Sequence, residues 1–224
     1  MALYDGNGNV ISTGEVNTAV CMPHYGHNCF VLGDSNLAFM SSAGNGYTLN
    51  NLFSGIGMSC LSYAGSGAAW HWSSGNNTAM GQLNTFINTY GEDQRVYTRC
   101  LIMLGTNDEV PGAYTDTAGA ETMVGKMRQA LDRLLSLPAF SSGTIWGVLP
   151  PLRYDTPQTL HADECMPEKI ELLRKVYADY CIPVLDLYYG GNIRQADMKT
   201  DNIHLSDGGY KKLTTAVRAF INTH

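Results

Sequence analysis

The chain has 224 residues, of which 44% are hydrophobic and 15% charged, a composition that excludes a disordered or coiled-coil protein and suits an α/β domain with a large core. The net charge of -6 argues against a basic nucleic-acid-binding face, and no apolar run approaches the roughly 18 residues of a membrane-spanning helix. We therefore expect no nucleic-acid partner and no membrane span.

Residues 1–27 are rich in Gly, Asn and other polar residues, which predicts turns or short hairpin strands. We interpret them as a turn-rich N-terminal extension that precedes one domain over residues 28–224.

From residue 28 onward, short apolar runs alternate with longer helical stretches, the pattern of βαβ units around a parallel sheet. The expected strands cover residues 29–32, 58–63, 100–104, 143–151 and 183–189. The expected helices cover residues 35–40, a stretch around Met123 to Leu135 that ends before Pro138, residues 168–180 and residues 207–223. These elements predict an α/β fold, a three-layer α/β/α sandwich with a central, mostly parallel five-stranded sheet of the flavodoxin-like kind.

The six cysteines form no Cys-x-x-Cys pair and no Cys/His cluster at the spacing of a zinc site, so we expect no metal site. Cys60 and Cys100 lie in apolar, strand-like runs and are interpreted as small buried hydrophobic residues. Cys21 and Cys29 flank a short loop and can pair if the compartment is oxidising, a condition that the sequence leaves open.

Ser35 directly follows the first expected strand, in the segment FVLGDSN, at the first turn of the next helix. The N–H groups of a helix N-terminus favour negative charge that develops there, so this position suits a nucleophile. The alternative is that Asp34 or Ser35 only caps the helix, which such residues do very often.

Asn107 follows the third expected strand, in the segment LIMLGTNDE. An amide held at the edge of a sheet can donate a hydrogen bond to an oxyanion. Alternatively, Asn107 forms an Asx-turn, because Asn favours turns through local hydrogen bonds.

Asp201 and His204 lie in the segment DNIHLSDGGY, just before the last expected helix. Their spacing lets the carboxylate accept a hydrogen bond from one ring nitrogen while the other nitrogen takes a proton from a serine. The alternative is that Asp201 or Asp207 caps the helix and His204 is a solvated loop residue.

These three pieces occur in one chain, each at a strand or helix terminus, and we expect them to share one edge of the sheet. In this combination the sequence resembles the SGNH (GDSL) hydrolase family. The resemblance covers about residue 28 to the C-terminus and rests on the blocks GDSN (33–36), GTND (105–108) and DNIH (201–204).

The resemblance implies a serine ester hydrolase without a cofactor, in which Ser35 is the nucleophile, His204 the general base and Asp201 the group that orients it. It also implies an oxyanion hole formed by the backbone N–H groups of Ser35 and Gly65 and by the side chain of Asn107.

The sequence departs from the family pattern in two places. Asn36 follows the nucleophile where the name-giving motif has Leu. In the segment SYAGSGAAW, Tyr63 occupies the place where the family usually has Asn, so Gly65 is the expected oxyanion donor and Gly67 the alternative.

Four further residues are candidates for substrate binding, namely Asp34, Trp70, Trp72 and Arg153. The two tryptophans follow the second block closely and can wall the cleft, but aromatic residues after a glycine turn are at least as often simple packing. Arg153 can meet an anionic group of the substrate, with a surface ion pair as the alternative.

The sequence contains no evident amphipathic segment of the kind that a long-chain lipase uses at its interface, which favours a short acyl group. Several members of the family remove acetyl groups from carbohydrates, and the Trp, Tyr, Asn and Gly residues around the expected cleft suit a sugar ring. We therefore expect a small-molecule or glycan ester as the substrate, with acetyl as the first choice.

Two other functions stay open as alternatives. The domain could be a carbohydrate-binding or adhesion module of a surface or phage-tail assembly, because its turn-rich start resembles linker sequence in such proteins. It could also be an acyltransferase, since an alcohol can intercept the same acyl-enzyme. The start of the chain lacks a secretory signal, so we expect a soluble protein that is cytoplasmic, or extracellular or virion-associated if a signal or carrier domain is missing.

Overall fold

The computed structural model describes residues 24–42, 46–71, 77–92, 96–154 and 166–224, together with two short strands near the start of the chain. These strands, β1 (Leu3–Tyr4) and β2 (Val10–Ser12), pair in antiparallel fashion. Trp72 and Cys21 lie outside the described residues, as does most of the expected extension.

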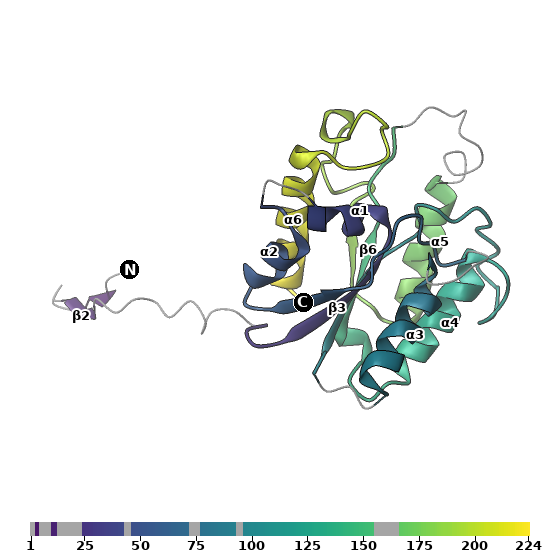
Figure 1. Cartoon of the computed structure of the whole chain (residues 1–224), viewed down its shortest axis with the longest axis horizontal. Coiled ribbons are helices and arrows are strands. Elements are labelled where there is room, and N and C mark those ends of the chain that lie inside the picture. Colours follow the sequence, from purple (N-terminus) through teal and green to yellow (C-terminus); the bar gives the residue numbers. More distant parts are fainter. Residues whose placement is uncertain are drawn as a thin grey trace.

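A five-stranded parallel sheet forms the centre of the domain (Figure 1). Its strands are β3 (Asn28–Gly33), β4 (Ser59–Ser62), β5 (Arg99–Met103), β6 (Ile145–Leu149) and β7 (Val184–Asp186). They lie in the order β4-β3-β5-β6-β7, and each neighbouring pair is parallel. The expected α/β fold with five strands is therefore confirmed.

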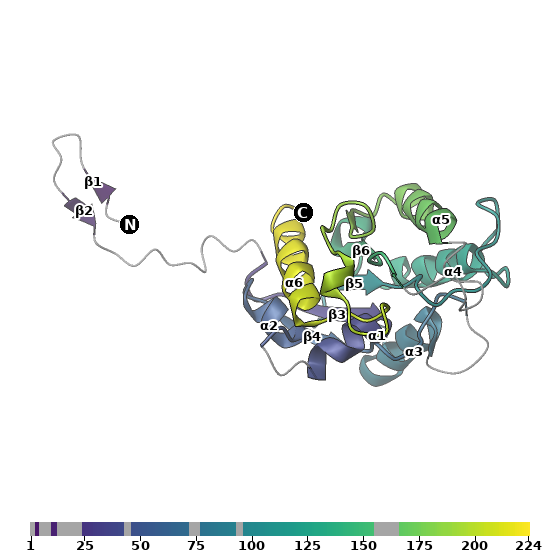
Figure 2. The same ribbon diagram turned by 90° about the horizontal axis from the view of Figure 1, so that it is seen from above.

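Helices cover both faces of the sheet, as the two views in Figures 1 and 2 show. One face packs against α1 (Ser35–Ala38), α2 (Leu49–Ser54) and α6 (Asp207–Ile221). The other face packs against α3 (Ala79–Tyr90), α4 (Met123–Leu135) and α5 (Met166–Asp179). Short 3-10 turns η2 (Phe39–Ser42), η4 (Ser142–Thr144) and η5 (Gln195–Asp197) complete the elements.

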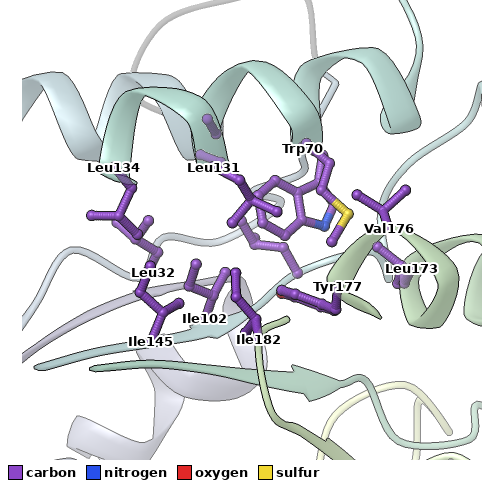
Figure 3. Packing of buried hydrophobic residues seen from close by; sticks show 14 of the residues in the cluster. Leu32, Trp70, Ile102, Leu131, Leu134, Ile145, Leu173, Val176, Tyr177 and Ile182 are labelled. Atoms are coloured by element: carbon purple, nitrogen blue, oxygen red, sulfur yellow. The ribbon is translucent and has the colours of Figure 1, made fainter. Parts of the chain in front are cut away.

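The central strands β3, β5 and β6 are mostly apolar because both faces of a parallel sheet are buried there. In β3, Phe30 and Leu32 enter the core beneath α3, α4 and α5, whereas Cys29 and Val31 enter the core beneath α1, α2 and α6. Figure 3 shows the first of these cores, where Leu32 lies among side chains from the neighbouring strands and from the helices above them.

Cys29 is fully buried in β3 and is a free thiol, so the disulfide considered with Cys21 is not formed in this structure. Cys100 is likewise buried, as expected from its apolar run. Cys60 is only partly buried, because it lies on β4, the edge strand of the sheet.

The connections place the site at one edge of the sheet. The chain passes from β3 to β4 on one side and then returns to β5 on the other side of β3. In open α/β sheets, such a reversal of strand order opens a crevice beyond the carboxyl ends of the strands. Ser35 lies just after β3, with only Asp34 between them, and Asn107 follows β5, so both lie at this reversal.

Candidate active site

Ser35 is the first residue of α1, and its hydroxyl is not the helix cap. The residue before it, Asp34, caps the helix by accepting a hydrogen bond from the N–H of Asn36 at 2.9 Å. The capping role considered for this segment therefore belongs to Asp34. The hydroxyl of Ser35 is left to interact across the sheet edge.

His204 joins Ser35 to Asp201 through its two ring nitrogens. Nε2 lies 2.9 Å from the Oγ atom of Ser35, and Nδ1 lies 2.7 Å from the Oδ2 atom of Asp201. In such a chain, Nδ1 donates its proton to the carboxylate and Nε2 is left as the acceptor for the serine proton. The arrangement can therefore convert a serine hydroxyl into a nucleophile.

The carboxylate of Asp201 is held by the turn in which it lies. Its Oδ1 atom accepts hydrogen bonds from the backbone N–H groups of Ile203 and His204, each at 2.9 Å. Partial burial raises the pKa of Asp201, but these N–H groups and the ring of His204 outweigh it and lower the pKa to about 2. The group facing the imidazole is thus a carboxylate.

Asn36, where the family motif has Leu, connects the two halves of the site. Its side chain is buried, and its Oδ1 atom accepts a hydrogen bond from the N–H of Leu205 at 3.2 Å. Leu205 directly follows His204, whose own carbonyl accepts from the N–H of Lys199 at 2.7 Å. The departure from the motif therefore supplies a bond that fixes the histidine loop beside the helix of Ser35.

The amide of Asn107 reaches across to the loop that follows β4. Its Nδ2 atom donates to the carbonyl of Ala68 at 2.9 Å, and within the described residues its Oδ1 atom accepts no hydrogen bond of the kind that an Asx-turn requires. A side-chain amide has two N–H donors, so the second stays available for another acceptor. Asn107 is half-buried at the edge where Ser35 also lies.

The backbone N–H of Gly65 is already used inside the fold. It donates to the carbonyl of Gly33 at 3.0 Å and so continues the pairing between β4 and β3. The expectation that Gly65 donates to an oxyanion is therefore not supported, because its N–H points into the sheet. The sequence could not reveal this, since the direction of a backbone N–H depends on where strand pairing ends.

Gly67, the alternative, lies in the turn that follows β4. Gly65 and Ala68 close a turn through a 3.2 Å hydrogen bond, and Gly67 lies in this turn with a φ of +71°, which favours glycine. Within the described part of the chain its N–H makes no hydrogen bond. Its neighbour Ala68 is the residue that anchors the Asn107 amide.

Gln82, which the sequence analysis did not single out, holds the end of β3. Its Oε1 atom accepts from the N–H of Gly33 at 3.0 Å, and its Nε2 atom donates to the carbonyl of Gly33 at 2.9 Å. Gln82 is buried and belongs to α3, a helix that was not predicted. The only feature of the sequence that could have indicated a role for Gln82 is that a glutamine lies on the apolar side of this helix.

Asp108 and Asp34 are buried carboxyl groups that lie next to residues of the candidate site. Asp108 accepts from the backbone N–H groups of Trp70 at 3.2 Å and His71 at 2.8 Å, which ties the turn of Asn107 to the loop after β4. Burial raises the pKa of Asp108 and of Asp34 to about 6, and hydrogen bonds from backbone N–H groups lower each pKa in part.

The candidates for substrate binding have different positions. Asp34 is buried and serves as the helix cap, and Trp70 is 1% exposed, with its ring 6.3 Å from that of Tyr177 in the core (Figure 3). The burial of both side chains does not support contact with a ligand at either position. Arg153 is half-buried and donates to the carbonyl of Thr106 at 3.4 Å, close to the site. The expectation for Trp72 concerns an undescribed residue.

The described residues show neither a metal-binding cluster nor a membrane-spanning helix. They contain no group of three or more His, Cys, Asp or Glu side chains that could hold a metal ion. In those same segments, no helix combines the length and the apolar character needed to cross a membrane.

Comparisons with known proteins give a consistent assignment. The sequence model of the GDSL-like lipase/acylhydrolase family matches residues 31–212. No protein with a curated description matches the chain.

Among solved structures, a lipase/acylhydrolase from Enterococcus faecalis is similar, with a TM-score of 0.62, 15% identity, and coverage of 88% of this chain and 96% of that one. A carbohydrate acetylesterase family member from Sinorhizobium meliloti has a TM-score of 0.59 and 16% identity over 88% of this chain and 96% of its own. A GDSL-like lipase from Bacteroides thetaiotaomicron has a TM-score of 0.58 and 13% identity over 92% and 94%. At these identities the likeness concerns the fold alone.

Proposed function

Because the chain belongs to the GDSL-like lipase/acylhydrolase family, we propose that it is a serine ester hydrolase that removes short acyl groups, acetyl foremost, from carbohydrates. The observation that carries this proposal is the unbroken path from Ser35 Oγ to His204 Nε2 at 2.9 Å and from His204 Nδ1 to Asp201 Oδ2 at 2.7 Å. A serine, an imidazole and a carboxylate in this order are the requirements of nucleophilic acyl transfer.

The first half of the reaction forms an acyl-enzyme. The Oγ atom of Ser35 attacks the ester carbonyl carbon while Nε2 of His204 takes the hydroxyl proton, and the carboxylate of Asp201 stabilises the resulting imidazolium. The tetrahedral intermediate then collapses. The bond to the alcohol oxygen breaks, and His204 gives its proton to the departing alcohol.

The oxyanion of that intermediate needs donors on one side of Ser35. We assign this role to the backbone N–H groups of Ser35 and Gly67 and to the second N–H of Asn107. The choice of Gly67 is supported by its N–H, which makes no hydrogen bond to any described residue, and by its place next to Ala68, which anchors Asn107.

The second half of the reaction releases the acid. Water, deprotonated by His204, attacks the acyl carbon, and the serine oxygen leaves with the proton that His204 returns to it. The same oxyanion donors serve both halves, since a negative oxygen forms in each.

Two observations support a short acyl group on a polar alcohol. The ring of Phe39 packs beside that of His204, with centroids 4.9 Å apart, and the ammonium of Lys199 lies 5.5 Å from the centroid of the Phe39 ring. A phenyl ring with a charge beside it thus lies next to the imidazole of His204. One structural neighbour is described as a carbohydrate acetylesterase family member, which agrees with this choice.

The test is hydrolysis of p-nitrophenyl acetate, butyrate and octanoate, with release of acetate from acetylated xylan measured beside them. We expect the acetate ester to give the highest kcat/KM, acetate to be released from xylan, and Ser35→Ala to lose both activities. Ser54→Ala, at the exposed end of α2, is the matched control and should retain them. Wild-type protein that binds acetylated xylan without turnover would instead support a carbohydrate-binding module.

A further inference from the structure

A lysine side chain lies fully buried beside the turn that carries Asn107. Lys169 is 0% exposed, although Glu168 and Lys175 on the same helix, α5, are exposed. An ammonium group removed from water is unfavourable unless specific acceptors replace the water. The partners of Lys169 therefore indicate what the charge does there.

Two of its hydrogen bonds lie on either side of Asn107. The Nζ atom donates to the carbonyl of Thr106 at 3.3 Å and to the carbonyl of Asp108 at 3.0 Å. The carbonyl of Thr106 belongs to the peptide plane that also contains the nitrogen of Asn107. The ammonium group thus holds the backbone immediately before and immediately after this residue.

The same helix supports the turn at a second point. Leu173, one helical turn after Lys169, packs so closely on Gly105 that a Cβ atom there would lie 2.6 Å from its Cδ1 atom. Gly105 has a φ of +122°, a conformation that a side chain would also oppose. The turn therefore cannot move toward α5.

The opposite side of the turn is tied to the loop after β4. The carboxyl group of Asp108 accepts from the N–H groups of Trp70 and His71, and the amide of Asn107 donates to Ala68. The turn is thus held between this loop and α5, and Lys169 supplies its charged contact on the helix side.

We propose that Lys169 is a positioning residue for Asn107. By holding the carbonyls of Thr106 and Asp108, it fixes the Asn107 amide where the oxyanion forms. This inference rests on the proposed function, because it gives Asn107 the role of an oxyanion donor.

Filling space is not a sufficient reason for a lysine here. Methionine has a similar length and fills a buried position without a charge, and apolar replacements of buried charges are often neutral or stabilising. What distinguishes lysine from methionine at this position is its set of hydrogen-bond donors. Lys169→Met therefore separates the positioning role from packing.

The decisive experiment is a double-mutant cycle on p-nitrophenyl acetate with wild type, Lys169→Met, Asn107→Ala and the double variant. If Lys169 acts through Asn107, Lys169→Met lowers kcat about 10-fold or more with KM changed by less than about twofold. In the Asn107→Ala background the same substitution then changes kcat by less than about twofold. An equal loss in both backgrounds, or no loss in either, overturns the proposal.

Lys175→Met makes the same chemical change at an exposed position of α5 and should leave kcat unchanged. If Lys169→Met does not fold, the cycle is repeated with Lys169→Arg, whose longer side chain shifts the two carbonyls. The proposal then requires that Lys169→Arg lowers kcat in the wild-type background and leaves kcat unchanged in the Asn107→Ala background.

A second readout does not depend on activity. The side-chain amide of Asn107 is observed by ¹H–¹⁵N NMR in wild type and in both Lys169 variants. We expect its resonances to shift or broaden in Lys169→Met, or in Lys169→Arg if only that variant folds, and unchanged resonances overturn the positioning role. If the wild-type protein hydrolyses no ester, the proposed function fails, while this spectrum still decides whether Lys169 positions the amide.

Discussion

The Nε2 atom of His204 lies 2.9 Å from the Oγ atom of Ser35, although 169 positions separate the two residues in the chain. Ser35 reaches this point because β3 ends just before it, and His204 reaches it because the loop before α6 returns to the same edge of the sheet. The buried Asn36 joins the two segments through the N–H of Leu205.

Replacing Asp201 by Asn should disable the imidazole while keeping the shape of the turn. The carboxylate holds the proton on Nδ1, whereas an amide can present a donor to this nitrogen and place the proton on Nε2. We expect kcat for p-nitrophenyl acetate to fall by on the order of 10³- to 10⁴-fold with little change in the melting temperature. A variant that keeps more than a tenth of wild-type kcat contradicts the role of Asp201.

The choice between Gly65 and Gly67 can be read directly from their amide resonances. Diethyl p-nitrophenyl phosphate phosphorylates an activated serine and leaves a P–O oxygen in the place of the oxyanion. We expect the ¹H resonance of the Gly67 N–H to move downfield on labelling, because the phosphoryl oxygen, a strong hydrogen-bond acceptor, now faces it. The resonance of Gly65 should stay in place, since its N–H donates to Gly33, and the reverse pattern restores Gly65.

The buried carboxyl of Asp34 should make the protein less stable as the pH rises. Its pKa is raised to about 6 in the folded protein, against about 3.9 in an unfolded chain, so the folded state binds the proton more tightly between these values. Stability from this group is complete below about pH 4 and is lost as the pH rises through about 6.

Asp34→Asn tests this dependence because it keeps the acceptor for the N–H of Asn36. Between pH 4.5 and 7, wild type should lose on the order of 1 to 3 kcal/mol more unfolding free energy than the variant, measured by urea denaturation. Parallel pH profiles for the two proteins contradict the raised pKa.

Removing the side-chain amide of Gln82 should destabilise the end of β3. Gln82→Met keeps the length of the side chain but leaves the buried N–H of Gly33 without its acceptor. We expect a loss of about 1 to 3 kcal/mol of unfolding free energy. Gln129→Met, at a half-buried position of α4, is the control, and equal losses in both variants contradict a specific role for Gln82.

The sequence allowed the sheet and most of the site to be predicted, for identifiable reasons. Strands buried on both faces appear as apolar runs, which located β3, β5 and β6 within one or two residues of their ends. Ser35, Asn107, Asp201 and His204 were found because each lies in a turn after an apolar run or before a helix.

The missed elements carried weak local signals. The segment of α3, AMGQLNTFINTY, is rich in Asn, Thr and Gly, which are poor helix formers, and it is stabilised by the Thr78 cap and by burial of Leu83 and Phe86. Tertiary packing, which the sequence does not show, overrides propensity there.

The buried contacts that hold the candidate site in place could not be predicted either. Lys169 shares the buried face of α5 with Ile170 and Leu173, so it interrupts an apolar stripe, but a lysine there does not tell which carbonyls it will meet. The hydrogen bond from the Gly65 N–H to the carbonyl of Gly33 likewise depends on strand register, which the sequence does not show.

The most direct test of the proposed mechanism is to identify the residue that becomes covalently modified. Wild type, Ser35→Ala and His204→Ala are treated with diethyl p-nitrophenyl phosphate, and the intact mass and peptide masses are measured. We expect one phosphoryl adduct per wild-type chain, on the peptide that contains Ser35, with no adduct in Ser35→Ala and greatly slowed labelling in His204→Ala. An adduct elsewhere, or equal labelling of wild type and Ser35→Ala, would contradict Ser35 as the nucleophile.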